Sequence, residues 1–434
     1  MKPLSYYYYF QTVRAVSSHL PMPLPILEKF FYKKSFLSLL ILSVFICVNP
    51  WFQSSELSAQ TMTGINVLET QKFAALAGKH VGLITNQTGV DRDGRSTIDL
   101  LAHARGVKLV ALFSPEHGIR GALDARVSSS TDEATGLPIY SLYGETDRPT
   151  DAMLAGLDAL VFDIQDAGVR FYTYITTMGY AMEAAAAHHI SFYVLDRPDP
   201  LGGDRIEGPM LDPDRTNFVG YFPMPVRMGM TLGEMAQMFN VEKKIDGDLH
   251  IIRMKNWRRN MWFHDAGLRW VNPSPNLRSE ESGVLYPGLE ILQAGGVSVG
   301  RGTETPFEIV GAPWIRGEEL ARYLNNQKIP GVRFEPRKFT PDSGLFKGGA
   351  CEGVHVLLVD RNALQSMRMG IELAAALAKL YPGKFEATKI ITLVGNVETI
   401  KQLQEGRDPA AIVNSWTFDL ESFRKMRAKY LLYP

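Results

Sequence analysis

The sequence predicts an α/β protein with two parts, a parallel-sheet domain over residues 61–285 and a smaller α+β domain over residues 286–434. Short apolar runs alternate with segments whose apolar residues recur at three and four positions, and this pattern changes near residue 285. Nearly continuous apolar strands separated by amphipathic helices are typical of a parallel sheet covered on both faces. The first domain is therefore predicted to be Rossmann-like.

The predicted strands and helices alternate along the first domain. The predicted strands are five apolar runs that each end in polar residues, at 80–86, 108–115, 158–166, 191–198 and 249–255. The predicted helices lie between them, at 96–106, 150–157, 176–189 and 230–240. Thr231 and Glu234 have the spacing of a capping box, and Gly106 stands where a helix is expected to end.

The second domain is predicted from a change of pattern. Residues 295–314 are Gly-rich and strand-like, and two helical stretches follow near 361–380 and 408–430. This mixture indicates an α+β domain. We expect it to close over the ligand-binding edge of the first domain.

The first sixty residues resemble an export signal. Lys33 and Lys34 precede the apolar run FLSLLILSVFICV, and the small-residue segment SELSAQ follows at 55–60. The apolar run is short for a membrane span, and an uncleaved membrane anchor is the alternative. We therefore expect residues 1–60 to be a signal peptide with an extended N-terminus. The mature protein is then periplasmic or extracellular, with no stable membrane insertion.

The charge balance argues against a nucleic-acid partner. The chain has 46 Lys and Arg residues, 46 Asp and Glu residues and no long basic run, whereas phosphate binding needs a clustered positive excess. The sequence TNQTGVDRDG follows the first predicted strand in place of a GxGxxG motif, which disfavours a dinucleotide. No HExxH metal motif occurs, and the GxSxG match GVSVG at 296–300 lies in the Gly-rich segment rather than at a strand-to-helix turn of the predicted parallel sheet, so it is not a nucleophile elbow. We therefore expect a small neutral or weakly anionic ligand, no cofactor and no metal.

Polar residues follow the predicted strands, whose carboxyl ends form the ligand-binding edge of such a sheet. Glu116 and His117 follow the second strand in LFSPEHGIRG. Because a partly desolvated carboxyl group can act as a proton donor, Glu116 is predicted to be the general acid. His117 is predicted to orient it or to bind substrate. Asp163 and Asp166 are candidates for a second catalytic carboxylate, and helix caps or ion pairs are the structural alternative.

The segment DIQDAGVRFYTY at 163–174 has the composition of a sugar-binding site. Tyr172 and Tyr174 share one face if the segment is extended, and aromatic rings beside acid, amide and arginine groups suit a saccharide. A packing corner between strand and helix is the alternative. Arg170 or Arg301 can pair with a ligand carboxylate. The other predicted substrate-binding residues lie at strand ends or in the NPSPN and GRGTE segments: Asn86, Arg197, Asn276 and Glu304.

Seven motifs, in this order along the chain, resemble those of the exo-β-N-acetylmuramidase family of bacterial glycoside hydrolases, formerly a family of unknown function. They are TNQTGVDRDGRSTIDLL, LFSPEHGIRG, TGLPIYSLYG, DALVFDIQDAGVRFYTYITTM, VLDRPDPLGG, PSPN and GRGTETPFEIVGAPW. The resemblance implies release of N-acetylmuramic acid from the non-reducing ends of peptidoglycan fragments. It further implies that Glu116 and His117 match the family's Glu and His, and that an Arg meets the lactyl carboxylate.

One segment departs from the family's pattern. Many relatives read close to FEGTNLSEGRGT where this chain reads LQAGGVSVGRGT, so Gln293, Gly296 and Val299 replace an acid, an Asn and another acid. Arg301 and Glu304 remain. A non-catalytic periplasmic muropeptide- or sugar-binding protein is one alternative, and a hydrolase acting on the lactyl peptide is another. For a glycosidase, retention, inversion and nucleophilic attack by the substrate's own N-acetyl oxygen all stay open.

Overall fold

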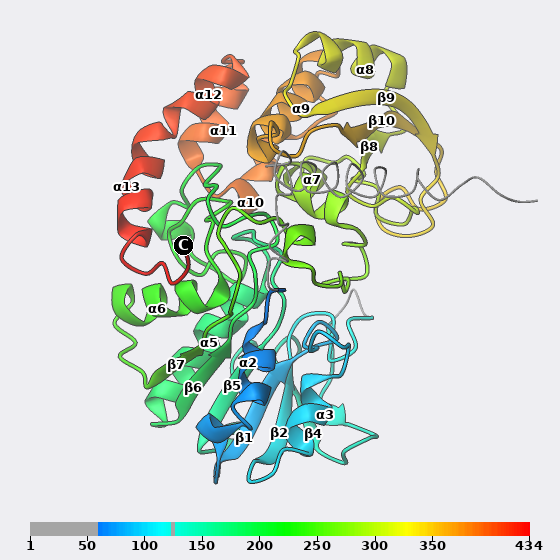
Figure 1. Cartoon of the computed structure of the whole chain (residues 1–434). Helices are drawn as coiled ribbons and strands as arrows, with labels where there is room; N and C mark the ends of the chain where they lie inside the picture. Colours follow the sequence, from blue (N-terminus) through cyan, green and yellow to red (C-terminus); the bar gives the residue numbers. More distant parts are fainter. Residues whose placement is uncertain (1–59, 123–125) are drawn as a thin grey trace, which may run out of the picture. The chain divides into compact units, whose positions relative to one another are not determined.

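The computed structural model describes residues 60–122 and 126–434 (Figure 1). Apart from Gln60, the predicted signal peptide at 1–60 lies outside the described residues. No helix in the described ranges is long and apolar enough to cross a membrane.

A seven-stranded sheet forms the centre of the first part of the chain; the apolar runs predict five of its strands, and the two strands within 130–141 are additional. Its spatial order is β3-β4-β2-β1-β5-β6-β7, and every neighbouring pair is parallel except β3 with β4. This is the Rossmann order with an added edge strand, so the strand order reverses between β1 and β5. The strands are β1 (His80–Thr85), β2 (Lys108–Ser114), β3 (Ser130–Thr131), β4 (Pro138–Ser141), β5 (Ala159–Asp163), β6 (Ser191–Leu195) and β7 (Leu249–Ile252).

Helices cover both faces of this sheet because successive strand residues point to opposite sides. Leu83 and Val161 belong to one apolar cluster, with residues of α2 and α3, whereas the adjacent Ile84 and Phe162 belong to another, with residues of α5 and α6. The capping box predicted for α6 is present, with Thr231 as the N-cap. These helices are α2 (Gly64–Thr70), α3 (Thr97–Ala102), α4 (Asp151–Leu154), α5 (Tyr174–Ala187) and α6 (Leu232–Glu242).

The second part is α+β, as expected. An antiparallel sheet, ordered β8-β10-β9, is made of β8 (Ile309–Ala312), β9 (Val332–Phe339) and β10 (Cys351–Leu358). Its helices are α7 (Glu280–Gln293), α8 (Gly317–Asn326), α9 (Ser366–Leu380), α10 (Ile391–Val394), α11 (Val397–Gln404), α12 (Pro409–Ser415) and α13 (Thr417–Arg427). Short 3₁₀ turns occupy Ala74–Leu76, Pro213–Arg215 and His264–Ala266 in the first part of the chain and Ala387–Ile390 in the second.

Helices α7 and α9 cross at two glycines. A Cβ at Gly288 would lie 2.0 Å from the carbonyl oxygen of Ser366, and a Cβ at Gly370 would lie 2.4 Å from the carbonyl oxygen of Gly288. Only residues without a side chain permit this approach. The crossing fixes α7, which carries part of the candidate site described below.

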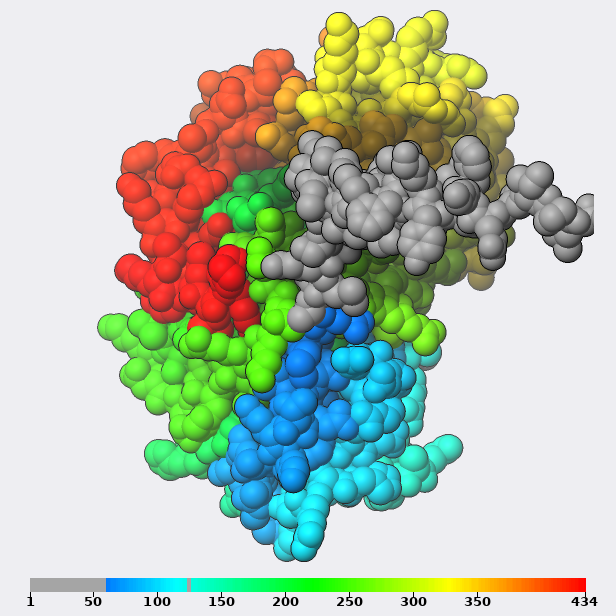
Figure 2. Space-filling view, viewed as in Figure 1, coloured from blue at the N-terminus to red at the C-terminus, as the bar shows by residue number. Residues whose placement is uncertain are grey.

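The two parts share one core. Helix α7 spans the expected boundary at 285/286, and one apolar cluster contains both Phe113 of β2 and Phe423 of α13. The C-terminal residues return to the first part, where the Tyr433 hydroxyl donates to Asp196 at 2.5 Å and the Leu432 amide donates to Glu234 at 2.8 Å. Figure 2 shows these red C-terminal residues against the green segments of the first part. A pocket between the parts therefore has walls fixed by common packing.

Candidate active site

A pocket of about 140 Å³, the Glu116 pocket, joins the carboxyl edge of the large sheet to α7 and the segment before β8. It brings together four predicted site residues: Glu116, His117, Tyr172 and Arg301. Its other lining residues come from the loop before α5, the 272–276 segment, α7, α10 and their neighbours: Phe171, Thr173, Val219, Ser274, Tyr286, Glu290, Phe307 and Leu393.

Glu116 lies in a tight turn directly after β2. The amide of Gly118 donates to the carbonyl of Pro115 at 3.1 Å, so Glu116 and His117 are the two central residues of the turn. Glu116 is partly exposed to the pocket, and its Oε2 accepts a hydrogen bond of 2.5 Å from the Thr173 hydroxyl. The strand end and the start of α5 thus hold this carboxyl group between them.

Two residues of the pocket have left-handed backbone conformations. His117 has φ +71° with 8% of its surface exposed, and Phe307 has φ +63° with 1% exposed. Such a φ is uncommon for residues other than Gly and Asn, and strained residues concentrate at functional sites. The surrounding packing therefore fixes both side chains at the pocket wall.

Aromatic rings form a connected wall from the first part of the chain to the second. The ring of Tyr172 lies edge-on to the rings of Tyr174 and Tyr286, with centroids 4.9 and 5.9 Å away. Tyr286 in turn meets Phe307 at 4.7 Å. Burial raises the pKa of the Tyr172 hydroxyl, and the nearby negative charges of Asp166 and Glu116 add to this shift. The hydroxyl therefore stays protonated and can only act as a neutral hydrogen-bonding group.

Tyr174 lies behind this wall rather than beside Tyr172 on an extended strand. It is the first residue of α5, is fully buried and donates from its hydroxyl to the carbonyl of Pro273 at 2.6 Å. The expected shared face is therefore absent because the helix begins at this residue. Tyr174 supports both Tyr172 and the segment that carries Ser274.

Glu290 is a second carboxylate in the pocket, and the sequence analysis missed it. Its Oε1 lies 2.9 Å from Nη2 of Arg301, and the side chain is 12% exposed. The guanidinium carbon of Arg301 lies 5.1 Å from the centroid of the Phe307 ring, within the range of a cation–π contact. The available signal is an acid inside an apolar helical run, since Leu289 and Ile291 on either side are fully buried.

The three residues that depart from the family's pattern do not line this pocket. Val299 is fully buried in the apolar core, and Gly296 has φ +91° with open space where a Cβ would be. Gln293 ends α7, three residues after Glu290. Residues three apart lie on one helix face. Glu290 therefore lies one turn before Gln293, the position at which many relatives have an acid and this chain has none.

Asp166 is buried behind the pocket. Its Oδ2 accepts from the Gly168 amide at 2.7 Å, and no described residue donates to Oδ1. Burial raises its pKa to about 8, and the neighbouring Asp199 carboxylate adds to this shift. Burial likewise raises the pKa of Asp199 to about 7. Asp166 is therefore mainly neutral at pH 7 and does not line the Glu116 pocket.

The structure does not bring Asp163 and Arg197 to the Glu116 pocket. Arg197 binds both oxygens of the fully buried Asp163, at 2.6 and 3.0 Å, and the Thr97 hydroxyl donates to the same carboxylate at 2.5 Å. The contacts give Asp163 a structural role in joining the ends of β5 and β6. Asn86 is also buried and accepts from the Thr88 amide and hydroxyl.

Arg170 is an interior residue rather than a ligand-binding one. It is 1% exposed and donates to four carbonyl oxygens at 2.7 to 3.1 Å, those of Pro209, Met224, Leu393 and Val394. Burial lowers its pKa to about 9. These bonds tie the loop before α5 to α10.

The last two predicted residues also lie outside the pocket lining. Glu304 is exposed, and Asn276 is buried two residues after Ser274. In the described part of the chain, no group of three His, Cys, Asp or Glu side chains can hold a metal ion.

Comparisons with known proteins agree across the chain. The family models described as exo-beta-N-acetylmuramidase NamZ, N-terminal and C-terminal, match residues 81–281 and 284–433. The peptidoglycan beta-N-acetylmuramidase NamZ of Bacillus subtilis (strain 168) is 45% identical over 379 residues, covering 86% of this chain and 92% of the relative. Two crystal structures of DUF1343 family proteins from Bacteroides fragilis NCTC 9343 are 40% and 30% identical, with TM-scores of 0.81 and 0.71. Both comparisons cover 86% of this chain and 99% of the other.

Proposed function

This chain belongs to the exo-beta-N-acetylmuramidase NamZ family, and we propose that it is an exo-acting glycosidase that releases N-acetylmuramic acid from the non-reducing end of peptidoglycan fragments. The observation that carries this proposal is the position of Glu116, which is partly exposed in a pocket between the two family-matched parts. The same pocket holds a second carboxylate, an arginine and aromatic rings. Glycoside hydrolysis usually uses two carboxyl groups, and an arginine can pair with the carboxylate of an acidic sugar.

Glu116 is the general acid in this proposal. Because the Thr173 hydroxyl donates to Oε2, a proton on the carboxyl group belongs on Oε1. That oxygen can then donate to the departing glycosidic oxygen. His117, held beside it in the same turn, is proposed to bind substrate or to orient the acid.

Glu290 replaces Asp163 as the proposed second carboxylate. It lines the pocket, whereas both oxygens of Asp163 are engaged by Arg197. Oε1 of Glu290 forms an ion pair with Nη2 of Arg301 at 2.9 Å. A charged carboxylate can activate water, stabilise an oxocarbenium-like transition state or orient the substrate's N-acetyl group.

Arg301 and the aromatic wall are proposed to select the sugar. An arginine has five N–H donors in a fixed fork, so Arg301 can serve Glu290 and the lactyl carboxylate together. The rings of Tyr172, Tyr286 and Phe307 supply an apolar surface for the pyranose ring. A sugar without the lactyl group lacks the partner for Arg301.

The chain is further proposed to act outside the cytoplasm, on fragments of peptidoglycan and without a nucleic-acid partner. The basic pair Lys33–Lys34, the apolar run after it and the small-residue segment at 55–60 support export. Fractionation of cells that express the full chain checks this. Recovery of the chain from the cytoplasm alone contradicts it.

The deciding experiment is hydrolysis of the disaccharide MurNAc–GlcNAc, with the products separated by mass. The parent protein is expected to release free N-acetylmuramic acid. Glu116→Gln is expected to lose at least a hundredfold in kcat, the usual contribution of a general acid. The exposed Glu133→Gln serves as the matched control and keeps full activity. Binding of the disaccharide without release of a monosaccharide would overturn the proposal.

A further inference from the structure

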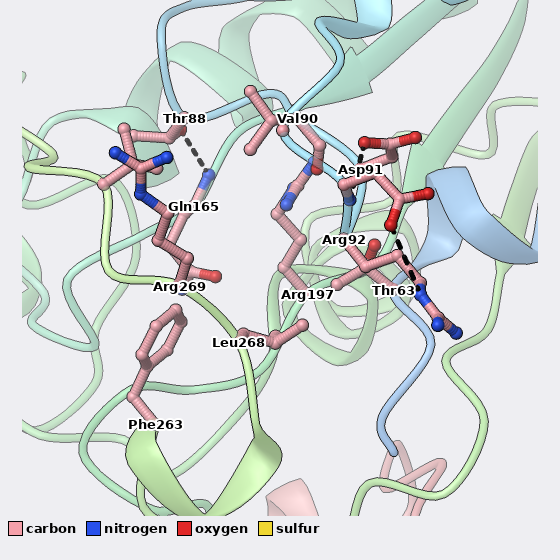
Figure 3. A pocket seen from close by; sticks show the side chains of 13 residues that line it. Thr63, Thr88, Val90, Asp91, Arg92, Gln165, Arg197, Phe263, Leu268 and Arg269 are labelled. Carbon is pink, nitrogen blue, oxygen red and sulfur yellow. Dashed lines mark hydrogen bonds and ion pairs between the residues drawn. The ribbon is translucent and has the colours of Figure 1, made fainter.

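A second cavity opens at the carboxyl edge of the large sheet and shares no lining residue with the Glu116 pocket. Its volume is about 350 Å³, and it lies beside the loops after β1 and β5, where the strand order reverses. Ligands of open α/β sheets bind at this reversal. We call it the switch-point cavity and define it by six of its lining residues: Thr88, Gln165, Arg197, Phe263, Leu268 and Arg269 (Figure 3).

One wall of the switch-point cavity is polar and rigid. Arg197 is 5% exposed and is fixed by Asp163 and by the carbonyl of Val90 at 2.8 Å. Gln165 is also 5% exposed, and its Nε2 donates to the carbonyls of Asp166 and Pro198. No described residue donates to its buried Oε1. A buried amide oxygen favours a donor, so this wall suits a ligand that carries N–H or O–H groups.

The same cavity also carries a positive charge, which favours an anionic group on the ligand. Within residues 60–122 and 126–434, the exposed guanidinium of Arg269 has no ion-pair or hydrogen-bond partner. Figure 3 shows Phe263 and Leu268 on one side of the hollow and Thr88 on the other. The other charged lining residues have partners of opposite charge, Asp91 with Arg95, Arg92 with Asp93 and Arg197 with Asp163. The cavity therefore combines an unpaired cation, a hydrogen-bond acceptor and an apolar side. A peptide that ends in a carboxylate presents the complementary groups.

A short segment connects this cavity with the Glu116 pocket. Val271 lines the switch-point cavity and Ser274 lines the Glu116 pocket, so their Cα atoms are at most about 11 Å apart. Gln87 fixes this segment by donating to the carbonyls of Asn272 and Pro273 at 2.7 and 3.3 Å. A substrate longer than one disaccharide can extend from one site to the other.

We propose that the switch-point cavity binds the carboxylate-bearing peptide on the leaving-group side of a peptidoglycan fragment. This inference rests on the proposed function, because the scissile bond at Glu116 defines the leaving-group side. The chain then recognises two acidic groups of one substrate. Arg301 is assigned to the lactyl group of the released sugar and Arg269 to the peptide of the next muramic acid.

The test is calorimetric titration with GlcNAc–MurNAc-peptide. This disaccharide matches the leaving group and has no N-acetylmuramic acid at its non-reducing end, so the proposed activity does not consume it. We expect it to bind at least fivefold more tightly than the same disaccharide without peptide. Arg269→Ala is expected to remove this difference, and the exposed Arg322→Ala to preserve it. Amidation of the peptide carboxylates is expected to act like Arg269→Ala.

Equal affinity for the two ligands overturns the inference, as does a peptide effect that survives in Arg269→Ala. Hydrolysis of MurNAc–GlcNAc by the same preparations reports separately on the proposed function. The Arg269→Ala variant is expected to hydrolyse MurNAc–GlcNAc at a rate within twofold of the parent, because this disaccharide carries no peptide. A loss of MurNAc–GlcNAc hydrolysis in Arg269→Ala well beyond twofold places Arg269 in the hydrolytic site and also overturns the inference.

Discussion

The hydroxyl of Thr173 donates a hydrogen bond of 2.5 Å to Oε2 of Glu116, across 57 positions of sequence. This bond joins the turn after β2 to the first turn of α5. It engages Oε2 rather than Oε1 and fixes the plane of the carboxyl group. The orientation of the proposed acid therefore depends on a residue that is not itself acidic.

Thr173→Val is expected to lower kcat on MurNAc–GlcNAc by about tenfold with little change in KM, because a freely rotating carboxyl group is presented less often in the productive orientation. Steady-state kinetics checks this. Thr177→Val, one turn further along α5, is the matched control, since its buried hydroxyl has no partner in the described chain. Equal losses in the two variants would attribute the effect to α5 packing and contradict the assignment.

Glu290→Gln is expected to reduce kcat by roughly a hundredfold, because the isosteric amide keeps the shape and removes the charge proposed to act in the reaction. Glu304→Gln is the matched control and stays within twofold, since Glu304 is exposed outside the pocket. A rise in KM alone for Glu290→Gln contradicts a catalytic role. That result limits Glu290 to placing Arg301 for substrate binding.

The pocket residues that sequence predicts are those that follow a strand or match a family motif: Glu116, His117, Tyr172 and Arg301. Parallel topology gathers strand ends whatever the tertiary details, so period and polarity suffice for Glu116 and His117, whereas Arg301 follows no strand of the parallel sheet and rests on the family motif. Glu290 escapes this reasoning because it lies within a helix. Its position depends on the α7–α9 crossing at Gly288, which brings distant segments together and has no local signal.

The buried charges show a second limit of prediction from sequence. Asp163, Arg170 and Arg197 lie among ligand-like residue patterns, yet Asp163 and Arg197 pair with each other and Arg170 donates to carbonyl oxygens of the protein itself. Residue type shows that a charged group needs a partner. It does not show whether the fold or a ligand supplies that partner, because the choice rests on contacts between distant segments.

Asp166→Asn is expected to weaken the pH dependence of stability. The folded-state pKa of Asp166 is about 8 and that of Asp199 about 7, both raised by burial from 3.8. The folded state therefore holds more protons than the unfolded state, and the free energy of unfolding falls as pH rises between about 4 and 8. The amide cannot ionise, so the variant loses less stability across this window.

Urea unfolding of the Asp166→Asn variant at pH 5 and pH 8 measures this effect. The fall in unfolding free energy between the two pH values is expected to be smaller than in the parent by at least about 1 kcal/mol. The exposed Asp214→Asn is the control and leaves the fall unchanged. An unaltered fall in Asp166→Asn contradicts the shifted ionisation.

Arg170→Met separates a structural role from ligand binding. The substitution keeps apolar bulk but leaves four carbonyl oxygens without their donor, so the free energy of unfolding is expected to fall by about 3 to 5 kcal/mol. Denaturant unfolding measures this loss, and the exposed Arg322→Met is expected to stay within about 0.5 kcal/mol of the parent. If Arg170 instead bound a ligand carboxylate directly, Arg170→Met would leave the free energy of unfolding unchanged and raise KM, because only the substrate would lose a partner.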